Sequence, residues 1–340
     1  MKASEEQHIE YEALDVLIVG AGISGLGMSY TLKKKRPHNS FAVIESRENF
    51  GGTWDLFKYP GIRSDSDMYT FAFSFKPWTD REYIATAERI QHYLGELVRD
   101  EGLNQYIRFQ QKVKAANWDS TKNRWLVTIS RADGSAYHIA AKFFTCCSGY
   151  YNYDKGYLPD FEGFDDFKGT IAHPQKWPEE LNYSGKKVIV IGSGATAVTI
   201  VPAMAKKAAH VTMLQRSPSY IVSRPASDVL FRVLSRVLPA GLTNRIMRLK
   251  YTTLQQMSFV LSKKFPSFVR KLVRKMNVKA LDGAADVDTH FNPNYQPWDQ
   301  RMALVPDADL FHSVRTGKST IVTDHIDRFT QTGVLTKNGT

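Results

Sequence analysis

Two glycine-rich turns carry the residue types and spacing in this chain that are best suited to chemistry. The first turn consists of Gly20, Ala21, Gly22, Ile23, Ser24 and Gly25, and the second consists of Gly192, Ser193, Gly194, Ala195, Thr196 and Ala197. Glycine lets the backbone approach a pyrophosphate closely, and the helix that follows such a turn presents free N–H groups and the positive end of its dipole to the phosphates. Two such turns in one polypeptide predict two bound dinucleotides, which suggests a flavin and a nicotinamide.

The residue at the end of the strand after each turn distinguishes the two dinucleotides. An apolar run at 41–44 ends at Glu45, twenty residues beyond Gly25, where an acid would meet a ribose hydroxyl. The run at 210–214 ends instead at Gln215, Arg216 and Ser217, and Arg216 can accept a 2′-phosphate. The second site is therefore predicted to prefer NADPH over NADH. The alternative is that Arg216 is only a solvated charge at a strand end.

Apolar runs and helical stretches surround both turns in the order strand, turn, helix. The predicted strands are 14–19, 41–44, 107–118, 124–131, 137–147, 187–191 and 210–214, of which 107–147 form an antiparallel insertion. The predicted helices include 23–35 and 86–100. A chain of 340 residues exceeds what a single core usually supports. The predicted fold class is α/β, with two Rossmann-like dinucleotide-binding domains.

The net charge of +11 comes from one segment. Residues 231–280 contain twelve Lys or Arg and no Asp or Glu, and the rest of the chain is close to neutral. This distribution argues against a general nucleic-acid-binding surface. The basic residues alternate with apolar ones such as Val233 and Leu234, which predicts a basic helical insertion at about 226–285. The insertion either contacts a membrane surface or an acidic partner, or packs its apolar face on the second domain.

The cysteines and the N-terminal residues favour a reducing compartment. Cys146 and Cys147 are adjacent, so no disulfide framework is expected, and the lack of a CxxC motif disfavours a disulfide reductase. Residues 1–12 hold four glutamates instead of the basic and apolar order of a secretory signal, and no apolar run approaches membrane-spanning length. We expect a cytoplasmic protein without a metal site, peripherally membrane-associated if the basic segment binds lipid.

The segment between the two turns carries the motif FxGxxxHxxxW, filled by Phe167, Gly169, His173 and Trp177. With a dinucleotide turn on each side of this motif, the chain resembles the type I Baeyer-Villiger flavin monooxygenases. The related flavin-containing monooxygenases usually end the motif differently, so Trp177 points to the Baeyer-Villiger branch. Similarity to the subgroup that contains ethionamide monooxygenase lies in 51–56, 59–69, 297–301 and 304–326. The resemblance implies that His173 transmits domain movement rather than acting as a general base, and that Trp177 packs.

The resemblance also implies contacts to FAD and NADPH. Besides the glycines of the first turn, FAD would contact Ser24, Glu45, Thr53, Trp54, Asp55, Leu56, Asp65 and Val113. NADPH would contact Arg63, Ser64, Asp65, Gly192, Ser193, Gly194, Ala195, Thr196, Ala197, Val198, Arg216 and Ser217. Trp54 could instead be a core aromatic that touches the flavin only through its backbone.

The reaction implied by the resemblance transfers oxygen from a flavin. NADPH reduces FAD, dioxygen adds to the flavin, and the peroxyflavin attacks a ketone carbonyl or a sulfur atom. Arg301 matches the arginine that stabilises the developing anion, and Asp65 matches the carboxylate that holds this arginine in position. Without the resemblance, Arg301 would be interpreted as a surface ion pair and Asp65 as a turn cap.

We expect an FAD-binding domain at 1–150, a connection with the motif at 151–184, and an NADPH-binding domain at 185–340 that ends with the start of a return to the first domain. Enzymes of this kind continue beyond this length, through a strand and an ATG-like turn that complete the FAD domain. A similar ATG-like turn should follow the third strand of the FAD domain, and here Cys147, Ser148 and Gly149 stand in its place. The C-terminal part is therefore expected to be missing, with weak or absent turnover. The alternatives are an N- or S-oxygenating flavin-containing monooxygenase, which would not convert a ketone to an ester, and a truncated nucleotide-binding protein without turnover.

Overall fold

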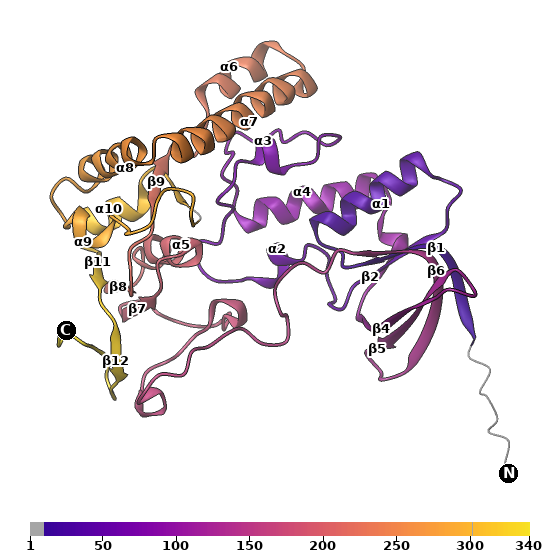
Figure 1. Cartoon of the computed structure of the whole chain (residues 1–340), viewed down its shortest axis with the longest axis horizontal. Coiled ribbons are helices and arrows are strands. Elements are labelled where there is room, and N and C mark those ends of the chain that lie inside the picture. Colours follow the sequence, from indigo (N-terminus) through magenta and orange to yellow (C-terminus); the bar gives the residue numbers. More distant parts are fainter. Residues whose placement is uncertain (1–9, 301) are drawn as a thin grey trace. The chain divides into compact units, whose positions relative to one another are not determined.

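The computed structural model describes residues 10–300 and 302–340, which form two compact units (Figure 1). Unit 1 comprises the residues up to Leu56 together with Glu88–Asp154, and unit 2 comprises Phe57–Ala87 and Lys155–Thr340. Segment 57–87 thus belongs with the second glycine turn, although it lies within the first 150 residues of the chain. The assignment of 1–150, 151–184 and 185–340 to an FAD domain, a connection and an NADPH domain stays a prediction.

A six-stranded sheet in the order β3-β2-β1-β6-β5-β4 forms the centre of unit 1. Its strands are β1 (Tyr11–Val19), β2 (Phe41–Ile44), β3 (Ile107–Arg108), β4 (Gln111–Asp119), β5 (Arg124–Arg131) and β6 (Ala136–Cys146). β1 pairs in parallel with β2 and β6, whereas β5 pairs antiparallel with β4 and β6. All four residues of β2 are buried, as is typical of a parallel strand covered on both faces.

The helices of unit 1 are α1 (Ile23–Lys35), α2 (Thr53–Leu56), α4 (Ala87–Asp100) and the short η1 (Asn104–Tyr106). The predicted helices at 23–35 and 86–100 are confirmed by α1 and α4. In α4, Ile90, Leu94 and Leu97 recur at helical spacing and are all buried, so burial of one face stabilises the helix. α1 follows directly on the turn after β1 and therefore aims its N-terminus at the carboxyl end of the sheet.

The predicted single strand at 107–118 is wrong. The structure has two strands there, because Gln110 adopts a left-handed φ of 55° that breaks the extended backbone between Arg108 and Gln111. β3 pairs with β2, whereas β4 pairs with β5. The backbone N–H groups of Gln110 and Gln111 donate to Arg47 O and Glu45 O, which fixes the start of β4 beside the end of β2.

Unit 2 contains a parallel sheet in the order β11-β8-β7. Its strands are β7 (Lys187–Ile191), β8 (His210–Gln215) and β11 (Ser319–Thr323), and two further pairs are formed by β9 (Ile221–Arg224) with β10 (Ala303–Pro306) and by β12 (Ile326–Phe329) with β13 (Val334–Thr336). The short helices of the unit are α3 (Met68–Phe71), η2 (Phe164–Asp166), η3 (Pro174–Lys176), α9 (Val287–His290) and α10 (Asp309–Arg315). α5 (Ala195–Met204) connects β7 to β8, which confirms the second strand, turn and helix.

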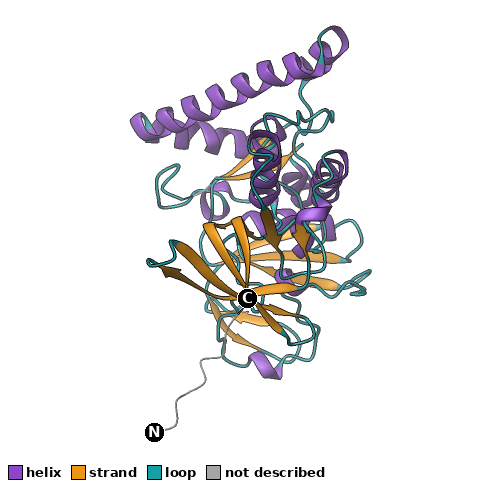
Figure 2. Cartoon of the chain, turned by 90° about the vertical axis from the view of Figure 1, so that its right-hand side faces the viewer, coloured by secondary structure: helices purple, strands orange, loops and turns teal. Residues whose placement is uncertain are grey.

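The predicted helical insertion at about 226–285 is confirmed by three helices, of which α7 crosses the top of Figure 2. They are α6 (Val229–Val237), α7 (Ala240–Lys264) and α8 (Pro266–Leu281). Asp228 caps α6 through its carboxylate, and Val269 and Val273 of α8 pack against Tyr220 beside β9. Among the described residues, no helix has the length and apolar character that a membrane span requires.

Candidate functional site

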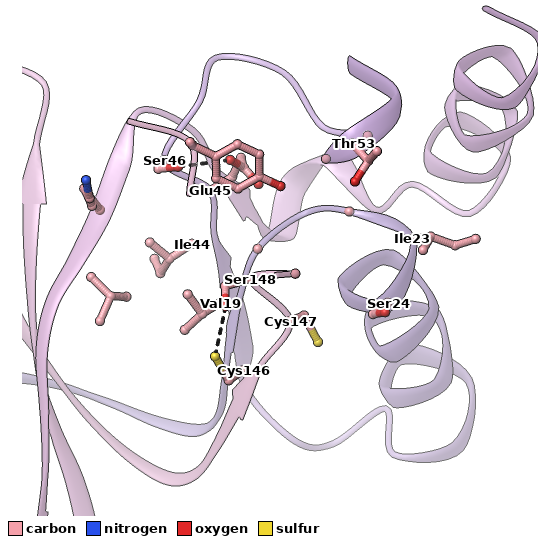
Figure 3. A pocket seen from close by; sticks show the side chains of 18 of the residues that line it. Val19, Ile23, Ser24, Ile44, Glu45, Ser46, Thr53, Cys146, Cys147 and Ser148 are labelled. Atoms are coloured by element: carbon pink, nitrogen blue, oxygen red, sulfur yellow. Dashed lines mark hydrogen bonds between the residues drawn. The ribbon is translucent and has the colours of Figure 1, made fainter. Parts of the chain in front are cut away.

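A cavity of about 530 Å³ opens at the carboxyl ends of β1, β2 and β6 in unit 1 (Figure 3). The first glycine turn forms one wall through Gly20, Gly22, Ile23 and Ser24. The other walls come from Glu45 and Ser46 after β2, from 51–54, from the start of β4 at 111–113, and from 146–149 with Tyr153. Parallel strands therefore bring segments that are distant in sequence to one edge of the sheet, which is where ligands of open α/β sheets bind.

The glycines of the first turn are required by close contacts of the backbone. Gly20 has a φ of 100°, and a Cβ there would lie 2.5 Å from Cys147 O. A Cβ on Gly25 would lie only 1.9 Å from Gly20 O. Gly22 is the N-cap of α1 and makes no side-chain cap, and the first turn of the helix holds no acidic residue. The turn therefore presents backbone and a helix N-terminus to the cavity, an arrangement that favours phosphate.

Glu45 is held in a fixed position at the end of β2. Its Oε2 accepts a hydrogen bond from the backbone N–H of Ala21 at 2.8 Å, and its Oε1 accepts one from the backbone N–H of Arg47 at 2.9 Å. The side chain is only 5% exposed, yet it lines the cavity. A carboxylate has about four acceptor sites, so this one retains capacity for a hydroxyl donor such as a ribose.

The loop after β2 is attached to the strand end by Arg47. Its guanidinium forms an ion pair with Asp55 at 2.8 Å and donates to Gly52 O at 3.3 Å. Of the four residues predicted to contact FAD in this loop, Thr53 and Trp54 line the cavity, whereas Asp55 and Leu56 are not among its described lining residues. Asp55 instead helps to hold the loop in position. Val113, at the start of β4, lines the cavity as its predicted contact requires.

Several lining residues were missed by sequence reasoning. Gln111, Lys112, Cys146 and Tyr153 belong to none of the motifs, whereas the turn at 147–149 was predicted as the replacement of an ATG-like turn. Burial raises the pKa of Tyr153 and of Cys147, so both groups keep their protons at neutral pH. Lys112 pairs with Asp154 at 2.9 Å, which ties the chain beyond β6 to β4. Strand order, which the sequence does not display, brings these residues together.

The second glycine turn lies in unit 2 between β7 and α5. Gly192 has a φ of 132°, and Gly194 is the N-cap of α5 without a side-chain cap. Ala197 occupies the position that corresponds to Gly25 of the first turn. Ser193 Oγ contacts Ser217 O at 3.2 Å and Ser219 Oγ at 2.9 Å. Arg216, next to Ser217, is exposed, and no ion pair links it to another described residue.

Segment 57–87 supplies the predicted residues Arg63, Ser64 and Asp65 within the same unit. A Cβ on Gly61 would lie 2.6 Å from Ala203 Cβ, so the segment packs closely on α5. Arg63 forms an ion pair with Asp309 of α10 at 2.5 Å. Burial raises the pKa of Tyr59, against the opposing effect of a hydrogen bond to Thr196 of the second turn. The structure thus gathers these residues around the second turn. Arg301, the predicted partner of Asp65, lies outside the described residues.

The FxGxxxHxxxW motif forms local contacts in unit 2. His173 accepts a hydrogen bond from the backbone N–H of Gln175 at 3.2 Å, and its Nε2 lies 3.2 Å from Tyr157 O. Phe167 packs edge-on against Phe329, and a Cβ on Gly169 would lie 2.4 Å from the Phe167 ring. Trp177 is half-buried. These contacts hold an irregular connection in place, whereas the role of His173 in domain movement stays a prediction.

Two open α/β units, each with a glycine turn at the carboxyl end of parallel strands, define a dinucleotide-binding protein. The family model described as flavin-binding monooxygenase-like matches residues 13–340. The chain belongs to this flavin-binding monooxygenase-like family.

Similar proteins agree with this assignment. The chain is 48% identical over 329 residues to the FAD-containing monooxygenase EthA of Mycolicibacterium smegmatis, covering 96% of this chain and 67% of the relative. It is 49% identical over 335 residues to the probable FAD-binding monooxygenase AlmA of Acinetobacter baylyi, covering 98% of this chain and 66% of the relative. The chain thus spans about two thirds of the length of these relatives.

The fold matches those of solved monooxygenases. An oxidized steroid monooxygenase bound to NADP superposes with a TM-score of 0.74 at 23% identity, over 96% of this chain and 69% of that one. An open structure of cyclohexanone monooxygenase superposes with a TM-score of 0.75 at 20% identity, over 97% of this chain and 71% of that one. The predicted fold class is confirmed. The similarity to EthA confirms the predicted resemblance to FAD-containing monooxygenases.

Proposed function

We propose that this chain is an FAD- and NADPH-dependent monooxygenase that inserts one oxygen atom from dioxygen beside the carbonyl of a ketone or onto sulfur. The observation that carries the proposal is the unit 1 cavity, where a glycine cradle, a helix N-terminus and the fixed Glu45 carboxylate lie along one sheet edge. Membership of the flavin-binding monooxygenase-like family supports a flavin as the ligand. The relatives named FAD-containing monooxygenases support the same choice.

The residues of the cavity fit FAD. Gly20 and Gly25 let the backbone of the turn pack closely enough to form the phosphate cradle, and Glu45 can accept from a ribose hydroxyl. Gly22, Ser24, Thr53, Trp54 and Val113 would complete the walls. In unit 2, the second turn and Arg216 fit NADPH. When bound, the two cofactors supply hydride and activated oxygen, while the chain orients them. Arg301 would stabilise developing negative charge, and the carboxylate of Asp65 would hold this arginine in position.

The visible absorbance spectrum tests the proposal first. The purified 340-residue chain is incubated with FAD, freed of unbound flavin, and then given NADPH with a ketone or a sulfide under air. We expect the protein to retain a flavin band. NADPH should bleach this band when oxygen is excluded, and under air the product should be an ester or a sulfoxide. A retained flavin that NADPH cannot reduce would contradict the proposal and leave a nucleotide-binding protein. A sulfoxide without any ester would favour the N- or S-oxygenating alternative.

Gly25→Ala should abolish flavin retention. The added methyl group would lie 1.9 Å from the backbone oxygen of Gly20, so the turn would have to open and the phosphate cradle would be lost. Gly241→Ala is the matched control, since a Cβ there meets nothing within 4 Å. The ratio of flavin to protein after gel filtration measures the effect. Equal flavin retention in the two variants would show that the first turn does not hold the cofactor.

We propose in addition that the helical insertion contacts an anionic membrane surface. Val229, Val233 and Val237 recur every four residues on α6 and are 67%, 54% and 72% exposed. Phe268, Leu272 and Met276 form a similar exposed stripe on α8. Residues 231–280 hold twelve cations and no acid. Exposed apolar stripes among cations complement a surface of acidic lipid. Each Lys or Arg near such a surface contributes about 1 kcal/mol to the free energy of membrane binding.

A further inference from the structure

The carboxylate of Asp67 lies under the insertion helix α7, two residues after Asp65. It caps α3 by accepting from the backbone N–H of Thr70 through Oδ1 and from Thr70 Oγ1 through Oδ2, both at 2.8 Å. Gln255 of α7 donates from Nε2 to Oδ2 at 2.6 Å. Asp67 is only 6% exposed, so a donor from the side chain of Gln255 stabilises a charge that water hardly reaches. The N-terminal end of α3 is thus attached to α7.

The C-terminal end of α3 is attached to the same helix. Arg248 Nη1 donates to Ala72 O at 3.0 Å and to Tyr69 O at 3.4 Å. These carbonyls belong to the end of α3, where a cation is favoured by the helix dipole and satisfies groups that lack a helical partner. Gln255 and Arg248 lie seven residues apart, which places them on one face of α7. α3 and α7 accordingly lie side by side (Figure 1).

The loop between Arg63 and α3 is also attached to segment 83–85. Ser64 N donates to Ala85 O and Met68 N donates to Tyr83 O, both at 2.8 Å. Tyr83 packs at 5.0 Å from the ring of Tyr251, which is also on α7 and donates to Asp228. The backbone on both sides of Asp65 is therefore tied to segment 83–85 and, through Asp67 and Tyr83, to α7.

We infer that α7 positions Asp65, with Gln255 and Arg248 as positioning residues that fix the loop from 64 to 72. The inference rests on the proposed function, because it assigns a consequence to the role proposed there for Asp65. Neither residue is among the predicted contacts to a cofactor. The insertion is thereby a working part of the oxygenation site and not only a surface element.

The test replaces the attraction between Gln255 and Asp67 by repulsion. In Gln255→Glu two carboxylates face each other at the distance of a hydrogen bond, and they cannot both be ionised at that distance. At low pH a proton shared between them holds the loop. As the pH rises this proton is lost, and repulsion between the carboxylates releases the loop. Adding Asp67→Asn to Gln255→Glu gives a double variant in which the asparagine amide can donate to the glutamate carboxylate, so a hydrogen bond between the two positions is restored. Gln256→Glu is the matched control, because it adds the same charge to α7 at an exposed neighbouring position.

Two readouts are taken between pH 5 and 8 on the FAD-loaded protein. Amide exchange of peptides spanning 64–72 should be about tenfold faster in Gln255→Glu than in the wild type at the higher pH. A factor of this size is expected when one hydrogen bond that holds the loop is lost. The fraction of consumed NADPH that appears as oxygenated product should fall in parallel. Both changes should be absent from Gln256→Glu and reversed in the double variant.

The outcomes separate the inference from the proposed function. Unchanged exchange in Gln255→Glu, or faster exchange with an unchanged product fraction, would overturn the positioning role and leave the proposed function intact. A wild-type chain that consumes NADPH but forms no oxygenated product would overturn the proposed function and the inference together.

Discussion

At the scale of single residues, the ends of two corresponding strands differ in charge and in burial. Glu45 ends β2 as a buried carboxylate held by two backbone N–H groups, whereas Arg216 follows β8 as an exposed cation. A fixed acceptor suits a ribose diol, and a guanidinium suits a phosphate because it offers paired donors in one plane. The sequence position of each residue was sufficient to predict this difference.

Arg216→Ala should weaken NADPH binding and leave NADH binding nearly unchanged. The lost charge-assisted hydrogen bonds are worth about 1.5–3 kcal/mol, which corresponds to roughly a 10- to 100-fold increase in Kd. Arg315→Ala removes another exposed cation of unit 2 and serves as the control. Titration of each variant with both nucleotides measures the change. An unaltered Kd for NADPH in Arg216→Ala would mean that Arg216 is a solvated charge.

At the scale of elements, Asp228 joins the start of α6 to the middle of α7. Its carboxylate accepts from the backbone N–H of Leu230, from Lys250 Nζ at 2.6 Å and from the Tyr251 hydroxyl at 2.7 Å. Burial alone would raise the pKa of Asp228, but the hydrogen bonds from Lys250 and Tyr251 outweigh it and hold the pKa below its ordinary value of 3.8. Folding therefore favours the charged form.

The stabilisation from Asp228 should be complete near neutral pH and disappear in acid. A carboxylate with a lowered folded pKa stabilises the protein above its unfolded value, and the effect is lost as the pH falls through the folded value. We expect Asp228→Ala to lower the free energy of unfolding by about 2–3 kcal/mol at pH 7, and by progressively less as the pH falls below 3.8. Urea unfolding at pH 7 and at a series of pH values below 3.8 measures this.

Asp286→Ala provides the comparison for Asp228→Ala. Asp286 caps the short helix α9 by accepting from the backbone N–H groups of Asp288 and Thr289, so its loss should cost about 1 kcal/mol for the cap alone. Equal effects of the two substitutions would show that Lys250 and Tyr251 add nothing to the cap of α6.

Periodic elements were predictable, and breaks within them were not. The residue pattern of 86–100 predicted α4, and the mixture of basic and apolar residues predicted the insertion. The break at Gln110 was not predicted because glutamine gives no signal for a left-handed φ. The conformation is accompanied by backbone hydrogen bonds from Gln110 to Arg47 and from Gln111 to Glu45, which follow β2 and are distant in sequence. The attachment of segment 57–87 to α5 also depends on tertiary contacts, such as that of Gly61 with Ala203.

At the scale of the whole molecule, the candidate site combines local signals with long-range ones. The glycine turns, Glu45 and Arg216 followed from spacing within two strand, turn and helix units. Lys112, Cys146 and Tyr153 enter the cavity only because β6 pairs with β1 and β4 starts beside β2. Pairings between strands a hundred residues apart leave no periodic mark on the sequence, so this half of the site could not be predicted.

The protein should sediment with vesicles that contain phosphatidylserine and not with vesicles of phosphatidylcholine alone. Raising the salt concentration should weaken the binding, because the cations of 231–280 are screened. Val233→Glu with Val237→Glu should abolish it by placing charges in the exposed stripe of α6. Ser235→Glu adds charge outside that stripe and should reduce binding far less. If the protein does not bind these vesicles even at low salt, the exposed stripe of α6 serves a partner other than a membrane. Self-association that the valine substitutions abolish would identify that partner as a second copy of the chain.

Among the side chains of α7 that contact α3, Tyr83 or Asp228 are Arg248, Tyr251 and Gln255. They lie at positions i, i+3 and i+7, within about two turns of a helix that advances 100° per residue. A single inserted or deleted residue between Arg248 and Gln255 would rotate one contact away from the others. Insertions or deletions beyond Gln255, where residues 256–261 are largely exposed, would leave all three in phase. Length variation in this helix should therefore be tolerated beyond Gln255 and not between Arg248 and Gln255.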